Sequence, residues 1–338
     1  MTSLPPRLSV LDRSPTRQGG SGARALRDTI RFAVDVEALG YHRFWVSEHH
    51  SVPGVSGSAP TVLAAAVASA TSRIRVGTGG VMLPNHRPMV VAEQFGVLES
   101  LFPGRIDMGL GRSVGFTDGI RRALGHGKED AADFGAQVTE LLGWFSGTQQ
   151  EFSGVHAIPA EGLRVPAFLL ATGSGAALAA ELGLPLVIAN IRGERPMIDA
   201  INAYRDNFRP SAISPAPYVV LSSAVAVAET TEKAWRMLVS EAWSTTYSRT
   251  RGEFPPLLPP ADVLALPMTD RERARFDSAL SGQVFGTADE VERTLGGLAG
   301  RSGADEILVT TSVFDLDERL DSYRRLAELA GIRPGQRA

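Results

Sequence analysis

Apolar segments alternate with segments of helical periodicity along the whole sequence. Each apolar run has the length and composition of a buried strand, and in the stretch after it apolar residues recur every three to four positions. The expected strands are 8–12, 43–50, 74–82, 105–112, 166–172, 184–190, 218–228 and 306–314, and the expected helices are 24–39, 60–71, 88–102, 131–145, 175–183, 197–208, 231–246 and 316–330. Alternation of this kind favours a parallel sheet, and eight repeats predict closure into a β/α (TIM) barrel. An open, doubly wound sheet is the competing interpretation.

One region departs from this alternation. Residues 249–287, which begin RTRGEFPPLLPP, are rich in proline and too long for a plain connector. Loops of this length are usually lids or binding loops, and a surface excursion with a short helix is an equal alternative. No change in composition marks a linker, so we predict one domain over residues 1–338 with a lid-like insertion.

Composition excludes several function classes. The 338 residues are 43% hydrophobic and carry a net charge of −3, so no basic surface for nucleic acid or anionic membrane is expected. The absence of cysteine excludes disulfides, thiolate metal sites and a cysteine nucleophile. The N-terminal MTSLPPRLSV lacks a signal-peptide pattern, and we expect a cytoplasmic enzyme. Only Lys128 and Lys233 are lysines among 34 basic residues, a bias that suggests a GC-rich genome.

Polar and glycine residues gather where the expected strands end. In a β/α barrel, functional residues lie at the C-terminal ends of the strands and in the loops that follow. The candidates are Glu48, His49 and His50 after the second strand, Thr78, Gly79 and Gly80 after the third, Arg112 after the fourth, Thr172, Gly173 and Ser174 after the fifth, and Asn190 after the sixth.

The run Glu48, His49 and His50 allows three interpretations. Neighbouring residues of a strand point to opposite faces, so the three side chains converge poorly on a metal ion, and we predict no metal site. A structural pairing of the glutamate with one histidine is a second interpretation. The third is a proton-transfer site, because a histidine exchanges its proton near neutral pH.

For the glycine-containing strand ends too, the sequence alone leaves two interpretations for each segment. Gly79 and Gly80 either permit a tight turn or let the backbone approach a flat ring closely. Thr172, Gly173 and Ser174 precede a helix, where hydroxyl groups and free amides bind phosphate, and Arg112 on the adjacent strand would add charge. An ordinary helix N-cap is the simpler alternative for the same three residues.

Three segments together resemble the bacterial luciferase-like monooxygenases. They are WVSEHH at 45–50, RVGTGGVMLPNHRPMVVAEQFGVLESLFPGRIDMGLGR at 75–112 and LAAELGLP at 178–185, and the FMN-type branch is the most similar. The resemblance implies a β/α barrel that binds reduced FMN, with the phosphate near the ends of strands four and five. It also implies a separate flavin reductase as supplier, and dioxygen that adds to the flavin as a hydroperoxide.

The resemblance assigns roles to particular positions. His49 matches the mechanistically important histidine, with Glu48 as its orienting partner, and Arg112 matches the arginine that binds phosphate. Gly79 and Gly80 match a peptide bond, often cis, beside the flavin ring, and Thr78 belongs to the same cofactor-binding segment.

Other positions depart from the family pattern. Gly111 stands where luciferase has a reactive cysteine, which argues against a light-emitting aldehyde reaction. The segment Thr172, Gly173 and Ser174 is one residue shorter than in close relatives, so the hydroxyl that meets the phosphate stays open. Asn190 and Ile191 replace a His-Phe pair, which implies a changed substrate pocket.

We therefore predict a reduced-FMN-dependent monooxygenase that hydroxylates or epoxidises a bulky apolar or aromatic small molecule, in secondary-metabolite (antibiotic) biosynthesis. The alternatives are a deazaflavin-dependent dehydrogenase and a non-catalytic flavin-binding protein. Expected partners are dioxygen, the substrate and a flavin reductase. The family usually forms homodimers, for which the faces of 61–70 and 89–98 are candidates.

Overall fold

Eight parallel strands close into a barrel in the computed structural model, which describes residues 4–333 except 6, 174 and 192. The ring runs β3, β2, β1, β11, β8, β7, β6 and β5, and β5 pairs back with β3. The strands are β1 (Leu8–Asp12), β2 (Arg43–Val46), β3 (Arg75–Thr78), β5 (Ile106–Gly111), β6 (Ala167–Ala171), β7 (Leu186–Ala189), β8 (Val219–Ser223) and β11 (Glu306–Val309). The predicted β/α barrel is thus confirmed, and the open sheet is excluded.

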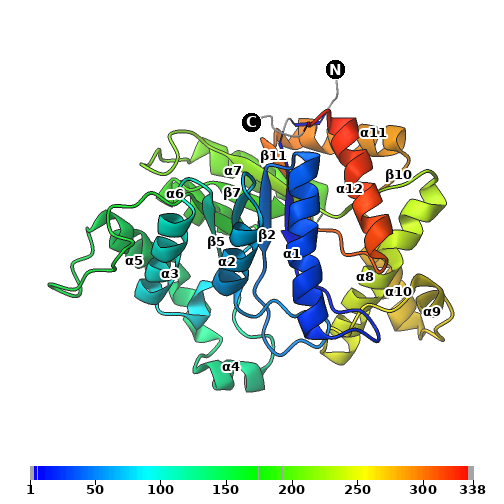
Figure 1. Ribbon diagram of the computed structural model, residues 1–338, viewed down its shortest axis with the longest axis horizontal. Coiled ribbons are helices and arrows are strands. Elements are labelled where there is room, and N and C mark those ends of the chain that lie inside the picture. The colour runs from blue at the N-terminus through cyan, green and yellow to red at the C-terminus, as the bar shows by residue number, and fades with distance from the viewer. Residues whose placement is uncertain (1–3, 6, 174, 192, 334–338) are drawn as a thin grey trace.

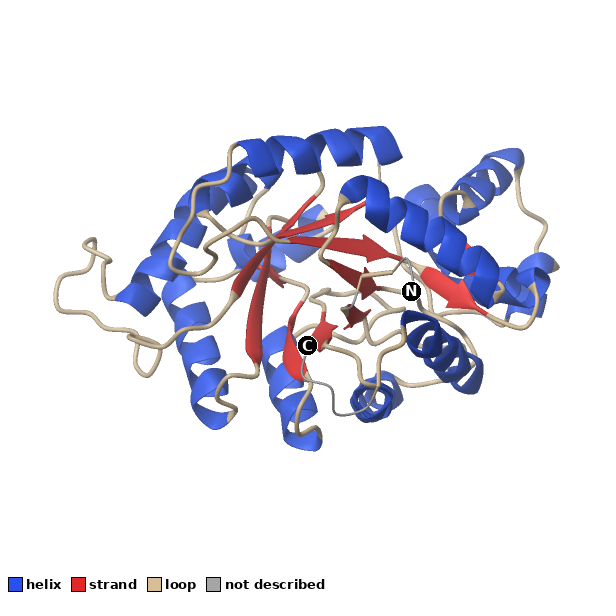
Figure 2. Ribbon diagram, turned by 90° about the horizontal axis from the view of Figure 1, so that it is seen from above, coloured by secondary structure: helices blue, strands red, loops and turns tan. Residues whose placement is uncertain are grey.

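Helices surround the strands when the molecule is seen from above (Figure 2). Except for α8 (Thr231–Arg251), whose buried residues form a separate apolar cluster, they bury their apolar faces on the barrel, as the helical periodicity of the sequence requires. The helices that follow the barrel strands are α1 (Gly22–Leu39), α2 (Pro60–Ala70), α3 (Pro88–Leu101), α5 (Phe134–Ser146), α6 (Gly175–Leu182), α7 (Glu194–Asp206), α8 (Thr231–Arg251) and α12 (Leu316–Ala330). No helix in the described ranges has both the length and the apolar character needed to cross a membrane.

Large side chains and a charged network fill the barrel interior. Trp45 and Phe168 meet edge to face with ring centroids 5.0 Å apart. Below them, Arg43 donates to Asp107 at 2.7 Å and to Glu306 at 3.0 Å, and Arg75 donates to Asp107 at 2.6 Å. Burial alone would raise the pKa of Asp107, but Arg43 and Arg75 outweigh it and hold that pKa below its usual range.

Several elements were not predicted. The expected strand 218–228 divides at Ala224, because β8 pairs within the barrel whereas β9 (Val225–Val227) leaves it to pair with β10 (Val284–Gly286). The additional short elements are β4 (Val81–Met82), η1 (Leu83–Asn85), α4 (Asp118–Leu124), η2 (Glu129–Asp133), α9 (Pro260–Leu264) and α10 (Asp270–Leu280), and a longer additional helix is α11 (Ala288–Ser302).

The insertion at 249–287 lies largely beside the barrel. Helices α9 and α10 pack against α8, as Figure 1 shows. Their residues Val263, Phe276 and Leu280 are buried in an apolar cluster that also contains residues of α8. The start of the insertion is different, because Leu257 exchanges two backbone hydrogen bonds of 2.8 Å with the loop that follows β1. This first part therefore lies at the barrel mouth, beside the loop that follows β1.

Candidate active site

A cavity of about 820 Å³ opens at the C-terminal ends of the barrel strands. This volume lies within the range of pockets that hold cofactors and drug-sized ligands. Its floor is apolar, and polar groups occupy its wall. Of the residues proposed from the sequence, the cavity is lined by Glu48, His49, His50, Gly79, Gly80, Gly111, Arg112, Thr172 and Ile191.

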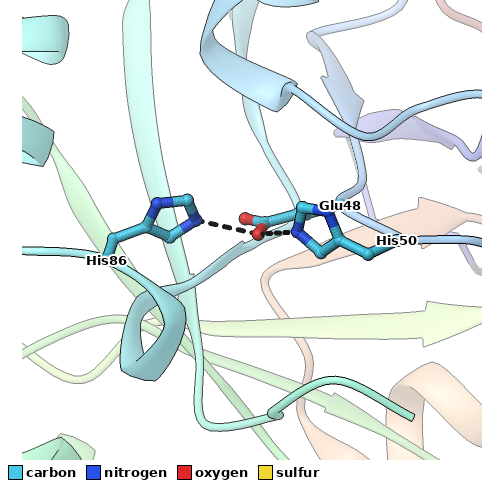
Figure 3. Close-up of side chains that lie close together, drawn as sticks. All are labelled: Glu48, His50 and His86. Atoms are coloured by element: carbon cyan, nitrogen blue, oxygen red, sulfur yellow. Dashed lines mark hydrogen bonds and ion pairs between the residues drawn. The ribbon is translucent and has the colours of Figure 1, made fainter. Parts of the chain in front are cut away.

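Glu48 lies between two histidines, His50 and His86 (Figure 3). Its Oε1 is 2.6 Å from Nε2 of His50 and 2.8 Å from Nε2 of His86, and its Oε2 accepts the backbone N–H of Met82 at 2.8 Å. Burial alone would raise the pKa of this carboxyl group, but the hydrogen bonds from His50 and His86 outweigh it and lower the pKa to about 2. Glu48 is therefore ionised at neutral pH, and both histidines donate to it.

The same three side chains have the composition of a metal-ligand set, since their ligand atoms lie within 4.8 Å of one another. The distances from Glu48 to the two histidines are those of charge-assisted hydrogen bonds, with no space for an ion between donor and acceptor. We therefore treat the cluster as a hydrogen-bonded set.

His49 points to other partners than Glu48. Its Nδ1 lies 3.1 Å from Oγ of Ser47, and its backbone N–H donates to Gly57. Burial and, next, the positive charge of Arg13 lower the pKa of His49 to about 4, so its ring is neutral at pH 7. Alternation along an extended chain explains the arrangement, because residues 48 and 50 share one side and residue 49 takes the other. The expected orientation of His49 by Glu48 is thus wrong, and Glu48 orients His50 and His86 instead.

The Gly79–Gly80 peptide bond is cis, as the resemblance implied. The barrel itself demands these glycines, because a Cβ on Gly79 would lie 2.7 Å from a Leu11 methyl carbon and one on Gly80 would lie 2.8 Å from the Gly109 carbonyl oxygen. Thr78 is fully buried and its hydroxyl bonds the backbone of Gly109, so its observed contacts hold β3 to β5.

The expected phosphate-binding residues lie on one side of the cavity. Arg112 is exposed and donates through Nε to the Ala131 carbonyl at 2.9 Å. Within the described part of the chain, its two terminal nitrogens have no hydrogen-bond partner. Thr172 is exposed at the start of α6 and lines the cavity; Gly173 adopts a φ of 101° beside it, and Ser174 lies outside the described residues.

Three lining or adjoining residues were missed at the sequence level. His86 reaches Glu48 from η1, and the aromatic rings of Phe116 and Phe254 meet at the cavity mouth with centroids 6.3 Å apart. Phe254 is the contribution of the insertion to this wall. His86 belongs to the segment 75–112 that carried the resemblance, but its spacing from Glu48 gave no signal of contact.

A cavity at the C-terminal strand ends is where β/α-barrel enzymes bind substrates and cofactors. The family model described as luciferase-like monooxygenase matches residues 7–296, so the chain belongs to this family and is a flavin-dependent monooxygenase. A luciferase-like monooxygenase of Escherichia coli strain K12 is 35% identical, over 96% of each chain. The N-acetyl-S-alkylcysteine monooxygenase of Bacillus subtilis strain 168 is 31% identical, over 95% of this chain and 97% of that protein.

Solved structures agree on the fold. The structure of apo-MsnO8 has a TM-score of 0.86 and 32% identity, and covers 97% of this chain and 98% of its own. A type II Baeyer-Villiger monooxygenase in complex with FMN matches with a TM-score of 0.71 and 17% identity, over 99% of each chain. An F420-dependent secondary alcohol dehydrogenase has the same TM-score at 16% identity, covering 97% of this chain and 99% of that chain. The fold alone thus accommodates either type of cofactor.

Proposed function

We propose that this chain uses reduced FMN and dioxygen to insert one oxygen atom into a bulky apolar or aromatic small molecule. The observation that carries the proposal is the single cavity of about 820 Å³ that brings Gly79, Gly80, His49, Arg112 and Thr172 together. The luciferase-like monooxygenase family of the chain, together with the FMN complex of a monooxygenase of the same fold, favours FMN over F420.

The residues present fit a flavin mononucleotide. Leu169, Val187 and Leu308 give the cavity an apolar floor on which a flat ring system can rest. Gly111 leaves space at the wall, because a Cβ there would meet no atom closer than the Val81 carbonyl oxygen at 3.7 Å. The free nitrogens of Arg112 and the hydroxyl of Thr172 would hold the phosphate. When bound and reduced, the flavin supplies the electrons that activate dioxygen.

Histidine side chains determine where protons are available. His49 is neutral at pH 7, and its Nδ1 is engaged by Ser47, which fixes the orientation of the ring. Its Nε2 is left to make one hydrogen bond to the reacting oxygen. His50 also lines the cavity, with its Nε2 committed to the ionised Glu48. We assign His49 to hydrogen bonding at the reaction centre and Glu48 to the orientation of His50.

The cavity mouth favours an apolar substrate and restricts water. Phe116 and Ile191 line the mouth, and 56% and 60% of their surfaces are exposed to solvent. Exposed apolar side chains of this kind favour the binding of an apolar ligand, because the ligand removes them from water. Phe254 packs against Phe116 at this mouth. Exclusion of water protects reactive oxygen species from unproductive decay, so we assign the first part of the insertion to covering the site. The apolar side chains at the mouth are compatible with a secondary metabolite as the substrate, which the enzyme would hydroxylate or epoxidise.

We further propose that a separate reductase supplies the reduced flavin and that the protein forms a homodimer. Exposed apolar side chains on two neighbouring helices support the dimer. They are Val62 on α2 and Val90, Val97 and Leu101 on α3, the helices whose faces the sequence nominated.

The test is turnover with an FMN reductase, NADH and a panel of aromatic compounds, with oxygen consumption and product measured together. We expect oxygen uptake coupled to a product that contains one added oxygen atom. Reduction of F420 without oxygen uptake would show a deazaflavin dehydrogenase instead. Tight flavin binding with no turnover of any compound would show a binding protein.

A further inference from the structure

A second, smaller pocket lies between α8 and α10, next to the main cavity. Its volume is about 250 Å³, and its walls carry Arg249, Arg275, Thr245, Ser278 and Ser281. The pocket is polar, in contrast to the floor of the main cavity. Ile191 lines both, so the two spaces adjoin at the end of β7.

The two arginines carry positive charge that no carboxylate in the described ranges neutralises. The same pair of helices does supply a partner elsewhere, because Arg251 on α8 pairs with Glu272 on α10 at 2.8 Å. Glu241, the acidic residue in the described wall of the pocket, is already engaged by Arg13 and by the backbone N–H of Ser312. Arg249 and Arg275 are thus available to an anion from solution.

The chemistry of this wall suits a carboxylate. Guanidinium groups bind carboxylate oxygens through two parallel N–H donors, and nearby hydroxyl groups can donate further hydrogen bonds. Ser278 and Ser281 provide such hydroxyls on the α10 side and Thr245 on the α8 side. A pocket of this size accepts a small charged group rather than a whole cofactor.

We propose that Arg249 and Arg275 bind the carboxylate of an amphipathic acid whose apolar part occupies the main cavity past Ile191. This assignment rests on the proposed function and names its substrate class, an apolar compound with one terminal anionic group. The arginines would select among apolar compounds and orient the chosen one, whereas the main cavity provides the site of oxygenation.

The experiment measures binding to the flavin-free full-length chain by calorimetry, with octanoate and octanamide as the probes. The two compounds share an apolar tail and differ in charge. We expect octanoate to bind about tenfold more tightly, the effect of charged hydrogen bonds that stay partly exposed. Arg249→Gln and Arg275→Gln should each reduce this preference several-fold, and the double variant should abolish it while octanamide binding stays the same.

Arg236→Gln is the matched control, because Arg236 is an exposed arginine of α8 that does not line the pocket. It should retain the full preference, and thermal melting should show that all variants are folded. Equal binding of octanoate and octanamide, or a preference that survives in the double variant, would overturn the proposal. Inorganic phosphate that binds the pocket as tightly as octanoate would replace it with a phosphate site. Because no flavin is present, these outcomes are independent of the turnover that tests the proposed function.

Discussion

Replacing Glu48 with glutamine removes one buried charge and leaves the shape of the side chain unchanged. The carboxylate is 3% exposed and accepts three N–H donors. Its pKa falls from 4.5 to about 2 in the folded protein. At about 1.4 kcal/mol per pKa unit, the ionised form contributes about 3 kcal/mol to stability at neutral pH. We expect Glu48→Gln to lower the free energy of unfolding by this amount.

The sign of the pH dependence follows from the lowered pKa. The stabilisation is fully present above pH 4.5, the ordinary value for glutamate, and is lost as pH falls through about 2. Urea unfolding of both proteins at pH 7 and at pH 3.5 measures the difference, which should be smaller at pH 3.5. Glu181→Gln on the exposed surface of α6 is the control and should match the parent protein at both pH values. A Glu48→Gln penalty that is absent at pH 7, or identical at the two pH values, would refute this reasoning.

Arg112→Ala should weaken FMN binding about tenfold or more in a fluorescence titration, because two charged donors are lost; unchanged affinity would place the phosphate elsewhere. His49→Ala should retain oxygen uptake but release hydrogen peroxide in place of product, and full coupling would contradict its assigned role. Asp107→Ala should destabilise the protein by about 3–5 kcal/mol in urea unfolding, since it leaves buried arginine charge unpaired. Val62→Asp with Val90→Asp should convert a dimer to a monomer in light scattering, and an unchanged mass would exclude these helices as the interface.

The strands and helices of the barrel could be predicted because local sequence determines them. The helix expected at 316–330 has those bounds in the structure. Gly40 ends α1 with a φ of 92°, the left-handed conformation that the predicted helix end needs. Both features depend on neighbouring residues only, namely the apolar period and a residue that tolerates positive φ.

Features that depend on distant partners were not predictable. A continuous apolar run at 218–228 gives no sign that Ala224 separates two strands, since the division depends on β10, about 60 residues later. Likewise, the sequence analysis predicts Glu48 as the orienting partner of His49, whereas the contacts of Glu48 are His50 and His86. The polar strand ends located the site, but side-chain direction and long-range packing decided which residues meet there.

Buried carboxylates lie at both ends of the barrel, and they are paired with different types of side chain at each end. At the N-terminal end, Asp107 and Glu306 are paired with Arg43, whose guanidinium keeps its proton at any physiological pH. None of these three residues lines the cavity. At the C-terminal end, Glu48 is bound by the imidazoles of His50 and His86, and both Glu48 and His50 line the cavity. Arg112 nearby keeps its terminal nitrogens free for a ligand. Buried carboxylates are therefore paired with arginine at the structural end of this barrel and with histidine at the end that holds the candidate active site.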